Sequence, residues 1–316
     1  MKILANDGIS QVGIDALEQS GFEVVTVHVA QEQLIQFINE NAIDGLLVRS
    51  ATQVGKDVID GCSGLKLIGR GGVGMDNIAV AHAKKKGLHV INTPAASSES
   101  VAELVFAHLY GGVRFLYDAN RNMPLEGDSG FKQLKKAYSK GTELRGKTLG
   151  IIGFGKIGQA TAKIALGVGM KVVYYDPEVD SCPLTLRFFD KQEVSFALKT
   201  QKKSEVLKAS DFISIHVPAQ KDYVLGAKEF EQMKDEVGIV NTARGGAIDE
   251  VALIDALENK KVAFAALDVF ESEPKPEIRI LMHPNISLSP HIGAATLEAQ
   301  DRIGLELADQ IARLLK

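Results

Sequence analysis

The chain has 316 residues, enough for two domains with hydrophobic cores of their own. Its net charge of −4 shows no basic field that would favour nucleic acid or an anionic membrane as a partner. No apolar run approaches 18 residues, and the polar Asn6 and Asp7 come too early for a signal peptide, so neither a membrane span nor secretion is expected. Two cysteines, Cys62 and Cys182, favour a cytoplasmic protein without a disulfide framework, and we expect no metal site.

Short apolar runs alternate with amphipathic stretches along almost the whole chain. The first series of expected strands comprises residues 2–7, 23–28, 45–50, 65–70 and 88–93. A long apolar helix is expected from Glu99 to Tyr117, followed by a polar, lysine-rich stretch over residues 119–147. The second series of strands comprises residues 148–152, 171–176, 212–218, 238–243, 262–270 and 286–290. Continuous apolar strands that alternate with helices predict two α/β domains, each a doubly wound parallel sheet.

The pattern G-x-G-x-x-G occurs twice, in residues 69–74 and 153–158. Glycines at this spacing let backbone amides at a helix N-terminus approach a pyrophosphate, and an acidic residue about 20 positions later binds the ribose hydroxyls. Residues 153–158 lie between a strand and a helix, and Asp176 follows 18 positions after Gly158. Residues 69–74 lack such an acid, so we expect a turn that approaches another ligand. Asp176 favours NAD over NADP because it would repel a 2′-phosphate, although Arg187 could offset this repulsion.

Polar residues follow the expected strands of the second series, where ligands of open parallel sheets bind. Arg244 could grip a carboxylate at two points, or it could simply pair with a nearby acid. His291 could serve as an acid–base group near neutral pH, although a lone histidine is more often structural. His216 competes with it and is better explained as lining the cofactor cleft.

An acidic loop follows the strand at 262–270 and offers a partner for His291. A carboxylate that accepts a hydrogen bond from an imidazole fixes the orientation of the ring. Glu271 and Glu273 both suit this role, and these residues alone do not distinguish them; a solvated loop acid is the alternative.

Four segments resemble, in this order, those of the NAD-dependent D-2-hydroxyacid dehydrogenases: GKTLGIIGFGKIG with VVYYDP, NTARGGAIDE, AALDVFESEP and LSPHIGAAT. The resemblance extends from Met1 to about Lys316. Within the family, LLVRSATQV, GRGGVGMDNI, NTPAASSESVAE and GTELRGKTLG are most similar to the D-3-phosphoglycerate dehydrogenases. Val73 departs from the pattern, since relatives often have a threonine there, and the stretch from Val179 to Ser204 is longer and more basic than we expect.

The resemblance implies that Arg244 binds the substrate carboxylate, that His291 is the acid–base group and that Glu273 is its partner. It also implies that Asp268 holds the nicotinamide carboxamide and that Asp176 holds the adenosine ribose. The full set expected at the NAD cofactor is Gly153, Gly155, Lys156, Ile157, Gly158, Asp176, His216, Val217, Pro218, Thr242, Ala243, Asp268 and Gly293. The set expected at the substrate is Arg49, Ser50, Gly72, Val73, Arg244 and His291.

The resemblance further implies a Rossmann domain over residues 99–289, inserted in a flavodoxin-like substrate domain formed by residues 1–98 and 290–316. The helix at 99–117 would build a homodimer, and no C-terminal regulatory domain is expected. The expected activity is reversible oxidation of a D-2-hydroxy acid, with 3-phosphoglycerate as the leading substrate and serine biosynthesis as the pathway. The alternatives are a glyoxylate, hydroxypyruvate or related D-2-hydroxyacid reductase and, more remotely, a non-catalytic NAD(H)-sensing protein.

The segment from Phe131 to Lys147 bears on the choice of substrate. It carries six basic residues against Glu143, so it could supply positive charge for a small anionic ligand. A solvated basic face is the alternative interpretation. Arg49 is the best single candidate for a phosphate contact.

Overall fold

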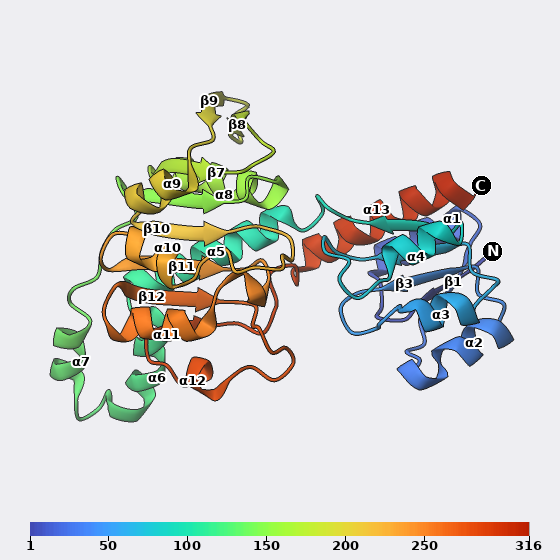
Figure 1. Cartoon of the computed structure of the whole chain (residues 1–316), viewed down its shortest axis with the longest axis horizontal. Coiled ribbons are helices and arrows are strands. Elements are labelled where there is room, and N and C mark those ends of the chain that lie inside the picture. The colour runs from blue at the N-terminus through green and yellow to red at the C-terminus, as the bar shows by residue number, and fades with distance from the viewer. Residues whose placement is uncertain (316) are drawn as a thin grey trace. The chain divides into compact units, whose positions relative to one another are not determined.

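The computed structural model describes residues 1–315 and divides them into two compact units (Figure 1). Unit 1 comprises Met1–Ser100 and the segment from Ala294 onward, and unit 2 comprises Val101–Gly293. Each unit contains one large sheet in which every paired strand is parallel, with helices around it, which confirms the predicted α/β fold class with two parallel-sheet domains.

Unit 1 is built on a five-stranded sheet in the order β2-β1-β3-β4-β5, a flavodoxin-like order. The C-terminal helix packs with α1 on this sheet through Leu17, Ile303, Leu307 and Ile311. The elements of unit 1 are β1 (Lys2–Ala5), α1 (Gln11–Gln19), β2 (Glu23–Val25), η1 (Gln31–Gln33), α2 (Leu34–Glu40), β3 (Gly45–Val48), α3 (Lys56–Gly61), β4 (Leu67–Arg70), α4 (Val80–Lys85), β5 (His89–Asn92) and α13 (Leu297–Leu315).

Unit 2 is built on a six-stranded sheet in the order β13-β12-β11-β10-β6-β7. The first helix of unit 2, α5, begins at the end of unit 1. The elements are α5 (Ser98–Val113), α6 (Leu116–Glu126), α7 (Phe131–Ala137), β6 (Thr148–Ile152), α8 (Lys156–Gly167), β7 (Lys171–Tyr175), β8 (Ser181–Arg187), β9 (Glu193–Lys199), α9 (Lys203–Ala209), β10 (Phe212–Ile215), α10 (Ala227–Gln232), β11 (Val237–Asn241), η2 (Gly245–Ala247), α11 (Glu250–Glu258), β12 (Val262–Leu267), α12 (Ile278–Leu281) and β13 (Ile286–Leu288).

The register of the unit 2 sheet aligns the carboxyl ends of its strands. Ile152 pairs with Tyr175 and Ile215, Ile215 with Asn241, Asn241 with Leu267, and Leu267 with Leu288. The residues that come next in the chain therefore form a row at one edge of the sheet. In sheet order from β7 this row is Asp176, Gly153, His216, Thr242, Asp268 and Ser289.

One expectation about the elements is wrong. The helix expected from Glu99 to Tyr117 ends at Val113, because Phe115 adopts a left-handed conformation with φ of 54°, and α6 begins directly after it. The polar stretch that follows contains α6 and α7. The segment from Val179 to Ser204, to which no element was assigned, forms the antiparallel hairpin of β8 and β9, which Figure 1 shows beside β7.

Candidate functional site

The glycine turn at 153–158 has the geometry that a dinucleotide-binding turn requires. Gly153 has φ of 92°, and a Cβ there would collide with the carbonyl of His216. A Cβ on Gly158 would collide with the carbonyl of Gly153, so these glycines let helix and strand pack closely. A Cβ on Gly155 would meet nothing within 4 Å. Open space therefore lies at the start of α8, whose N-terminal residue Gly155 provides no side-chain cap to the backbone amides.

Asp176 fastens the glycine turn to the end of β7. Its Oδ2 accepts a hydrogen bond from the amide of Phe154 at 2.6 Å, and its Oδ1 accepts from the amides of Glu178 and Val179 at 2.8 and 3.0 Å. The hydroxyl of Thr200, at the return of the hairpin, both accepts from the Asp176 amide and donates to its carbonyl, each at 3.1 Å. The acid that the sequence singled out therefore lies at the turn.

The second glycine pattern lacks this geometry. β4 ends at Arg70, and no helix begins in residues 71–79, so the amides of residues 69–74 do not lie at a helix N-terminus. The turn is held instead by the side chain of Asn92, which donates to the carbonyl of Val73 at 2.7 Å. Gly72 is buried and Val73 is exposed in unit 1.

Arg49 and Ser50 lie on a loop of unit 1 that two polar side chains hold. The carboxylate of Asp7 accepts the Arg49 amide at 2.6 Å and the Thr52 hydroxyl at 2.6 Å. The side chain of Asn77 donates to the carbonyls of Arg49 and Thr52 at 2.8 and 2.6 Å. Asp7 and Asn77 were not among the predicted site residues, although Asp7 follows the first strand in the manner of the other strand-end residues.

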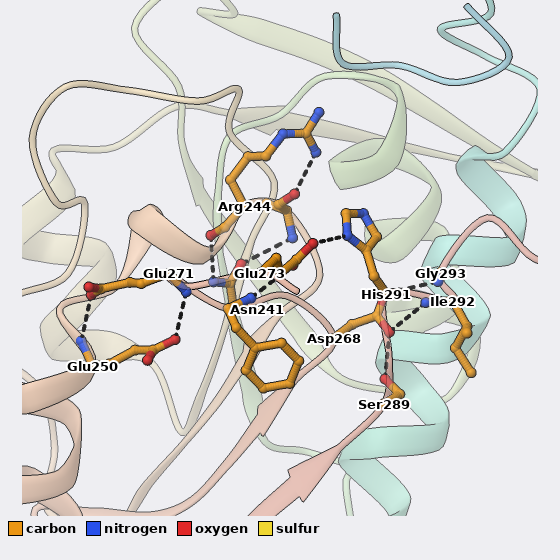
Figure 2. A network of polar contacts seen from close by, with 12 residues as sticks. Asn241, Arg244, Glu250, Asp268, Glu271, Glu273, Ser289, His291, Ile292 and Gly293 are labelled. Carbon is orange, nitrogen blue, oxygen red and sulfur yellow. Dashed lines mark hydrogen bonds and ion pairs between the residues drawn. The ribbon is translucent and has the colours of Figure 1, made fainter. Parts of the chain in front are cut away.

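Arg244 follows β11 on a turn that Asn241 organises. The Asn241 side chain donates to the Arg244 carbonyl at 2.8 Å and accepts from the Ala243 amide at 3.0 Å. The Arg244 guanidinium donates to the carbonyl of Ala243 at 2.6 Å. Figure 2 shows the guanidinium and the ring of His291 extending to the same side of these loops.

His291 and Glu273 form a hydrogen-bonded pair. The distance from His291 Nδ1 to Glu273 Oε2 is 2.8 Å, and the second oxygen of Glu273 accepts from the Phe270 amide at 3.0 Å. The side chain of His291 is 44% exposed, so the ring is accessible from solvent. The two acids of the loop therefore have different partners, because Glu271 forms hydrogen bonds with Glu250 and not with His291 (Figure 2).

Asp268 holds the loop that carries His291. The Asp268 side chain is buried, and its Oδ1 accepts from the Ser289 hydroxyl at 2.6 Å and the Ile292 amide at 2.8 Å. Its Oδ2 accepts from the Gly293 amide at 2.9 Å. This local role was not foreseen in the sequence analysis, where Asp268 was expected at the nicotinamide.

Glu250 and Glu271 fasten the acidic loop to the start of α11. The Glu250 amide donates to Glu271 Oε1 at 3.0 Å, and the Glu271 amide donates to Glu250 Oε1 at 2.9 Å. Glu250 is buried and its Oε2 has no hydrogen-bond partner. Burial raises the pKa of Glu250, and the nearby charge of Glu271 acts in the same direction.

His216 lies in the row, and its ring nitrogens are buried. Its Nε2 hydrogen-bonds to the hydroxyls of Ser214 at 2.9 Å and Thr161 at 3.3 Å, while Nδ1 has no partner. Burial lowers the pKa of His216 to about 3, so the ring is neutral at physiological pH. A neutral, buried imidazole suits the lining of a cleft better than acid–base work.

The described part of the chain contains neither a cluster of metal-binding side chains nor a helix that could cross a membrane. In residues 1–315 no group of three or more His, Cys, Asp or Glu side chains gathers as a metal site would require. None of the helices in that range is both long and apolar enough to cross a membrane.

Comparison with known proteins identifies the family. Residues 106–293 match the model of the D-isomer specific 2-hydroxyacid dehydrogenase, NAD binding domain. The hydroxypyruvate reductase of Thermotoga maritima is 43% identical over 99% of this chain and 98% of its own length. The chain belongs to the D-isomer-specific 2-hydroxyacid dehydrogenases. It is therefore an NAD-dependent oxidoreductase, as the sequence predicted.

Other members differ in length and substrate. The D-3-phosphoglycerate dehydrogenase of Methanocaldococcus jannaschii is 39% identical over the whole chain, which spans 58% of that relative's length. The NAD⁺-bound 3-phosphoglycerate dehydrogenase of Entamoeba histolytica has a TM-score of 0.78 and 28% identity, covering 100% of this chain and 95% of its own. The chain thus spans a little over half the length of the curated D-3-phosphoglycerate dehydrogenase of M. jannaschii.

The residues of unit 2 fit a bound NAD. The open space at Gly155 leaves room at the N-terminus of α8, where helix amides and dipole favour a pyrophosphate. The Thr242 hydroxyl oxygen and His216 Nδ1 are buried in the strand-end row without hydrogen-bond partners. Both observations suit a polar ligand along this edge.

Substitutions at Gly155 and Gly158 separate the two roles of the glycine turn, which are space for the ligand and close packing of helix against strand. Gly155→Ala should lower the Tm of the apoprotein by no more than about 3 °C, because an alanine cap costs about 1 kcal/mol or less. It should weaken NADH binding about tenfold or more, since its methyl group enters the open space. Gly158→Ala should lower the Tm by more than Gly155→Ala does, because its methyl group meets backbone. Calorimetry and NADH titration measure both; equal NADH affinity in Gly155→Ala and wild type would contradict the assignment.

The buried Glu250 predicts a pH-dependent stability. Its pKa is raised above the usual 4.5 in the folded state, so its contribution to stability is full below that value and is lost as the pH rises through the raised pKa. Glu250→Gln keeps an acceptor for the Glu271 amide and carries no charge at any pH. The Tm of this variant minus that of the wild type should therefore increase from pH 4.5 to pH 8. A difference that stays constant over this range would contradict the raised pKa.

Proposed function

We propose that the chain catalyses the reversible oxidation of a D-2-hydroxy acid at a site formed by Arg244, Glu273 and His291. The observation that carries this proposal is the 2.8 Å hydrogen bond between His291 Nδ1 and Glu273 Oε2 on two loops beside the strand-end row. An accessible imidazole with a fixed carboxylate partner is the arrangement that moves a proton at a hydroxyl group.

The hydrogen bond fixes the tautomer of His291. An ionised carboxylate can only accept, so Nδ1–H donates to Glu273 and Nε2 presents its lone pair. His291 Nε2 takes the proton of the substrate hydroxyl on oxidation and returns it to the ketone oxygen on reduction. Glu273 stabilises the imidazolium that forms in between.

Arg244 orients the substrate. Its planar guanidinium can bind a carboxylate at two points, which aligns C2 for the reaction. NAD, when bound, accepts or supplies the hydride, and the protein's contribution is orientation and electrostatics. His216 is neutral and buried and does not compete for the proton.

For the substrate, we favour hydroxypyruvate with its product D-glycerate. The support is the Thermotoga maritima reductase, which this chain matches over nearly its whole length. The basic segment that suggested a phosphate site ends at Lys147, immediately before the amino end of β6, and so lies at the edge of the unit 2 sheet opposite to the strand-end row. It therefore gives no support to phosphate binding beside His291 within this unit.

The second candidate substrate is 3-phosphoglycerate, the leading expectation from the sequence. It is supported by the relatives named D-3-phosphoglycerate dehydrogenase and by Arg49, whose half-buried side chain lies on the fixed loop of unit 1. In that case the enzyme would serve the phosphorylated route to serine.

A homodimer remains part of the proposal. α6 has no buried residue, and Leu116, Leu125 and Phe131 are 63%, 76% and 56% exposed. Figure 1 shows α6 and α7 extending from the end of α5 beyond the sheet of unit 2. An arm with so little contact of its own and several exposed apolar side chains suits burial against a second copy.

The acid–base assignment predicts a contrast between two neighbouring glutamates. Glu273→Gln should lower kcat by about 10- to 100-fold, because the imidazolium loses its counter-charge. Glu271→Gln is the matched control; it keeps the acceptor for the Glu250 amide and should stay within about threefold of wild type. Steady-state kinetics with a 2-keto acid and NADH measures both. Equal losses in the two variants would remove Glu273 from the mechanism.

The substrate is tested with a panel of hydroxypyruvate, glyoxylate and phosphohydroxypyruvate. We expect the largest kcat/KM with hydroxypyruvate and at most a twofold change in that value in Arg49→Gln. If phosphohydroxypyruvate is preferred, and Arg49→Gln raises its KM about tenfold or more, the second candidate is correct. Neither outcome affects the assignment of His291.

The dimer is tested by sedimentation equilibrium at micromolar concentration. The wild type should sediment at twice the chain mass, and Leu116→Glu with Leu125→Glu should shift it toward the monomer while the far-UV spectrum stays unchanged. A monomeric wild type would contradict the dimer.

A further inference from the structure

His108 on α5 is a buried histidine that the proposed mechanism does not use. It is 7% exposed, and both ring nitrogens have serine partners in the segment that leads to His291. Nδ1 lies 2.9 Å from the hydroxyl of Ser287 in β13, and Nε2 lies 2.9 Å from the hydroxyl of Ser289 directly beyond that strand.

The direction of these hydrogen bonds follows from the carboxylate at their end. The Ser289 hydroxyl donates to Asp268 Oδ1 at 2.6 Å, because an ionised carboxylate only accepts. Ser289 must therefore accept from His108, which places the proton on Nε2. His108 Nδ1 is then the acceptor for the Ser287 hydroxyl. One neutral tautomer satisfies every group in the chain Ser287–His108–Ser289–Asp268, and burial, which lowers the pKa of His108, keeps the ring neutral.

The carboxylate of Asp268 also binds the loop that carries His291. Asp268 accepts the amides of Ile292 and Gly293 at 2.8 and 2.9 Å, immediately after His291. His291 itself has φ of 54°, a left-handed conformation that is unfavourable for a residue with a side chain. The hydrogen bonds to Asp268 hold the backbone in this conformation, and it presents the ring to Glu273.

We infer that His108 is a positioning residue that acts through Ser289 and Asp268 to hold the His291 loop in its active conformation. This inference rests on the proposed acid–base function of His291. An apolar residue in place of His108 would leave the Ser289 oxygen buried without a donor. The Asp268 carboxylate would then have a hydroxyl partner free to rotate, and the loop would lose its fixed anchor.

Two pairs of variants separate this role from simple packing. Ser289→Ala removes the link to Asp268, whereas Ser287→Ala removes the other bond of His108 and keeps that link. His108→Gln can place an amide N–H near the position of Nε2, whereas His108→Asn reaches only the position of Nδ1. The two serine variants each lose one hydroxyl at the same exposure of 8%, so packing alone predicts equal effects in that pair. Asn is one methylene shorter than Gln, so in the second pair the exchange of the Ile292 and Gly293 amides separates the lost hydrogen bond from the lost volume.

The variants should differ in kcat and in hydrogen exchange at the His291 loop. Ser289→Ala and His108→Asn should each lower kcat about tenfold with the KM of the keto acid within twofold, while Ser287→Ala and His108→Gln stay within threefold of wild type. The double variant His108→Asn with Ser289→Ala should lose no more than either single variant, because both interrupt one path. In the apoprotein, hydrogen exchange at the amides of Ile292 and Gly293 should be faster than in wild type for Ser289→Ala and His108→Asn, and unchanged for Ser287→Ala and His108→Gln.

The inference is overturned if Gln and Asn at position 108 behave alike, or if the double variant shows the product of the two single losses. It is also overturned if exchange at the two amides does not change. His291→Gln, measured alongside, reports on the proposed function separately: if it retains turnover, the acid–base assignment fails, while the exchange data still decide whether His108 holds the loop.

Discussion

The buried carboxylate of Asp268 is the interaction on which the site of unit 2 depends. A charge with 1% exposure is costly unless it is fully hydrogen-bonded, and Asp268 receives three donors from the Ser289–Gly293 segment. Those donors come from residues on both sides of His291, so the hydrogen bonds that satisfy the buried charge also fix the position of the His291 ring. The left-handed backbone of His291 is stable because these bonds over-determine it.

The parallel sheet of unit 2 explains why these groups meet at one edge. Its register brings the carboxyl ends of six strands level, and each strand then contributes one residue or loop to the row that runs from Asp176 to Ser289. The glycine turn lies at the junction of β6 with its two neighbours and gives access to the amides of α8. Arg244, Glu273 and His291 follow the three strands on the other side. The glycine turn and the loops that carry Arg244, Glu273 and His291 thus lie along one edge of the sheet because of strand order.

Much of this could be predicted from the sequence, because strand bodies are apolar and their ends are polar. Apolar runs located every strand of the two large sheets, and the acid after Gly158 distinguished the glycine turn from the one at residues 69–74. Strand-end polarity alone did not distinguish Glu271 from Glu273, because two acids two positions apart differ only in how the loop folds. The family resemblance implied Glu273, and this is the acid that lies 2.8 Å from His291. The break at Phe115 was missed, although Gly111 and Gly112 lie just before it, because apolar residues continue on both sides of the break. The role of His108 could not be predicted from the sequence, because its partners lie about 180 positions away in the chain.

In the proposed mechanism His291 moves the proton at the substrate oxygen, while other groups bind and orient the substrate. The most direct measurement is single-turnover reduction of hydroxypyruvate by NADH in His291→Gln, together with the Kd of NADH. Loss of the acid–base group should lower the rate by about 10²- to 10⁴-fold relative to wild type, with the Kd of NADH unchanged within about threefold. A reduction rate within about threefold of wild type, at the same NADH affinity, would contradict it.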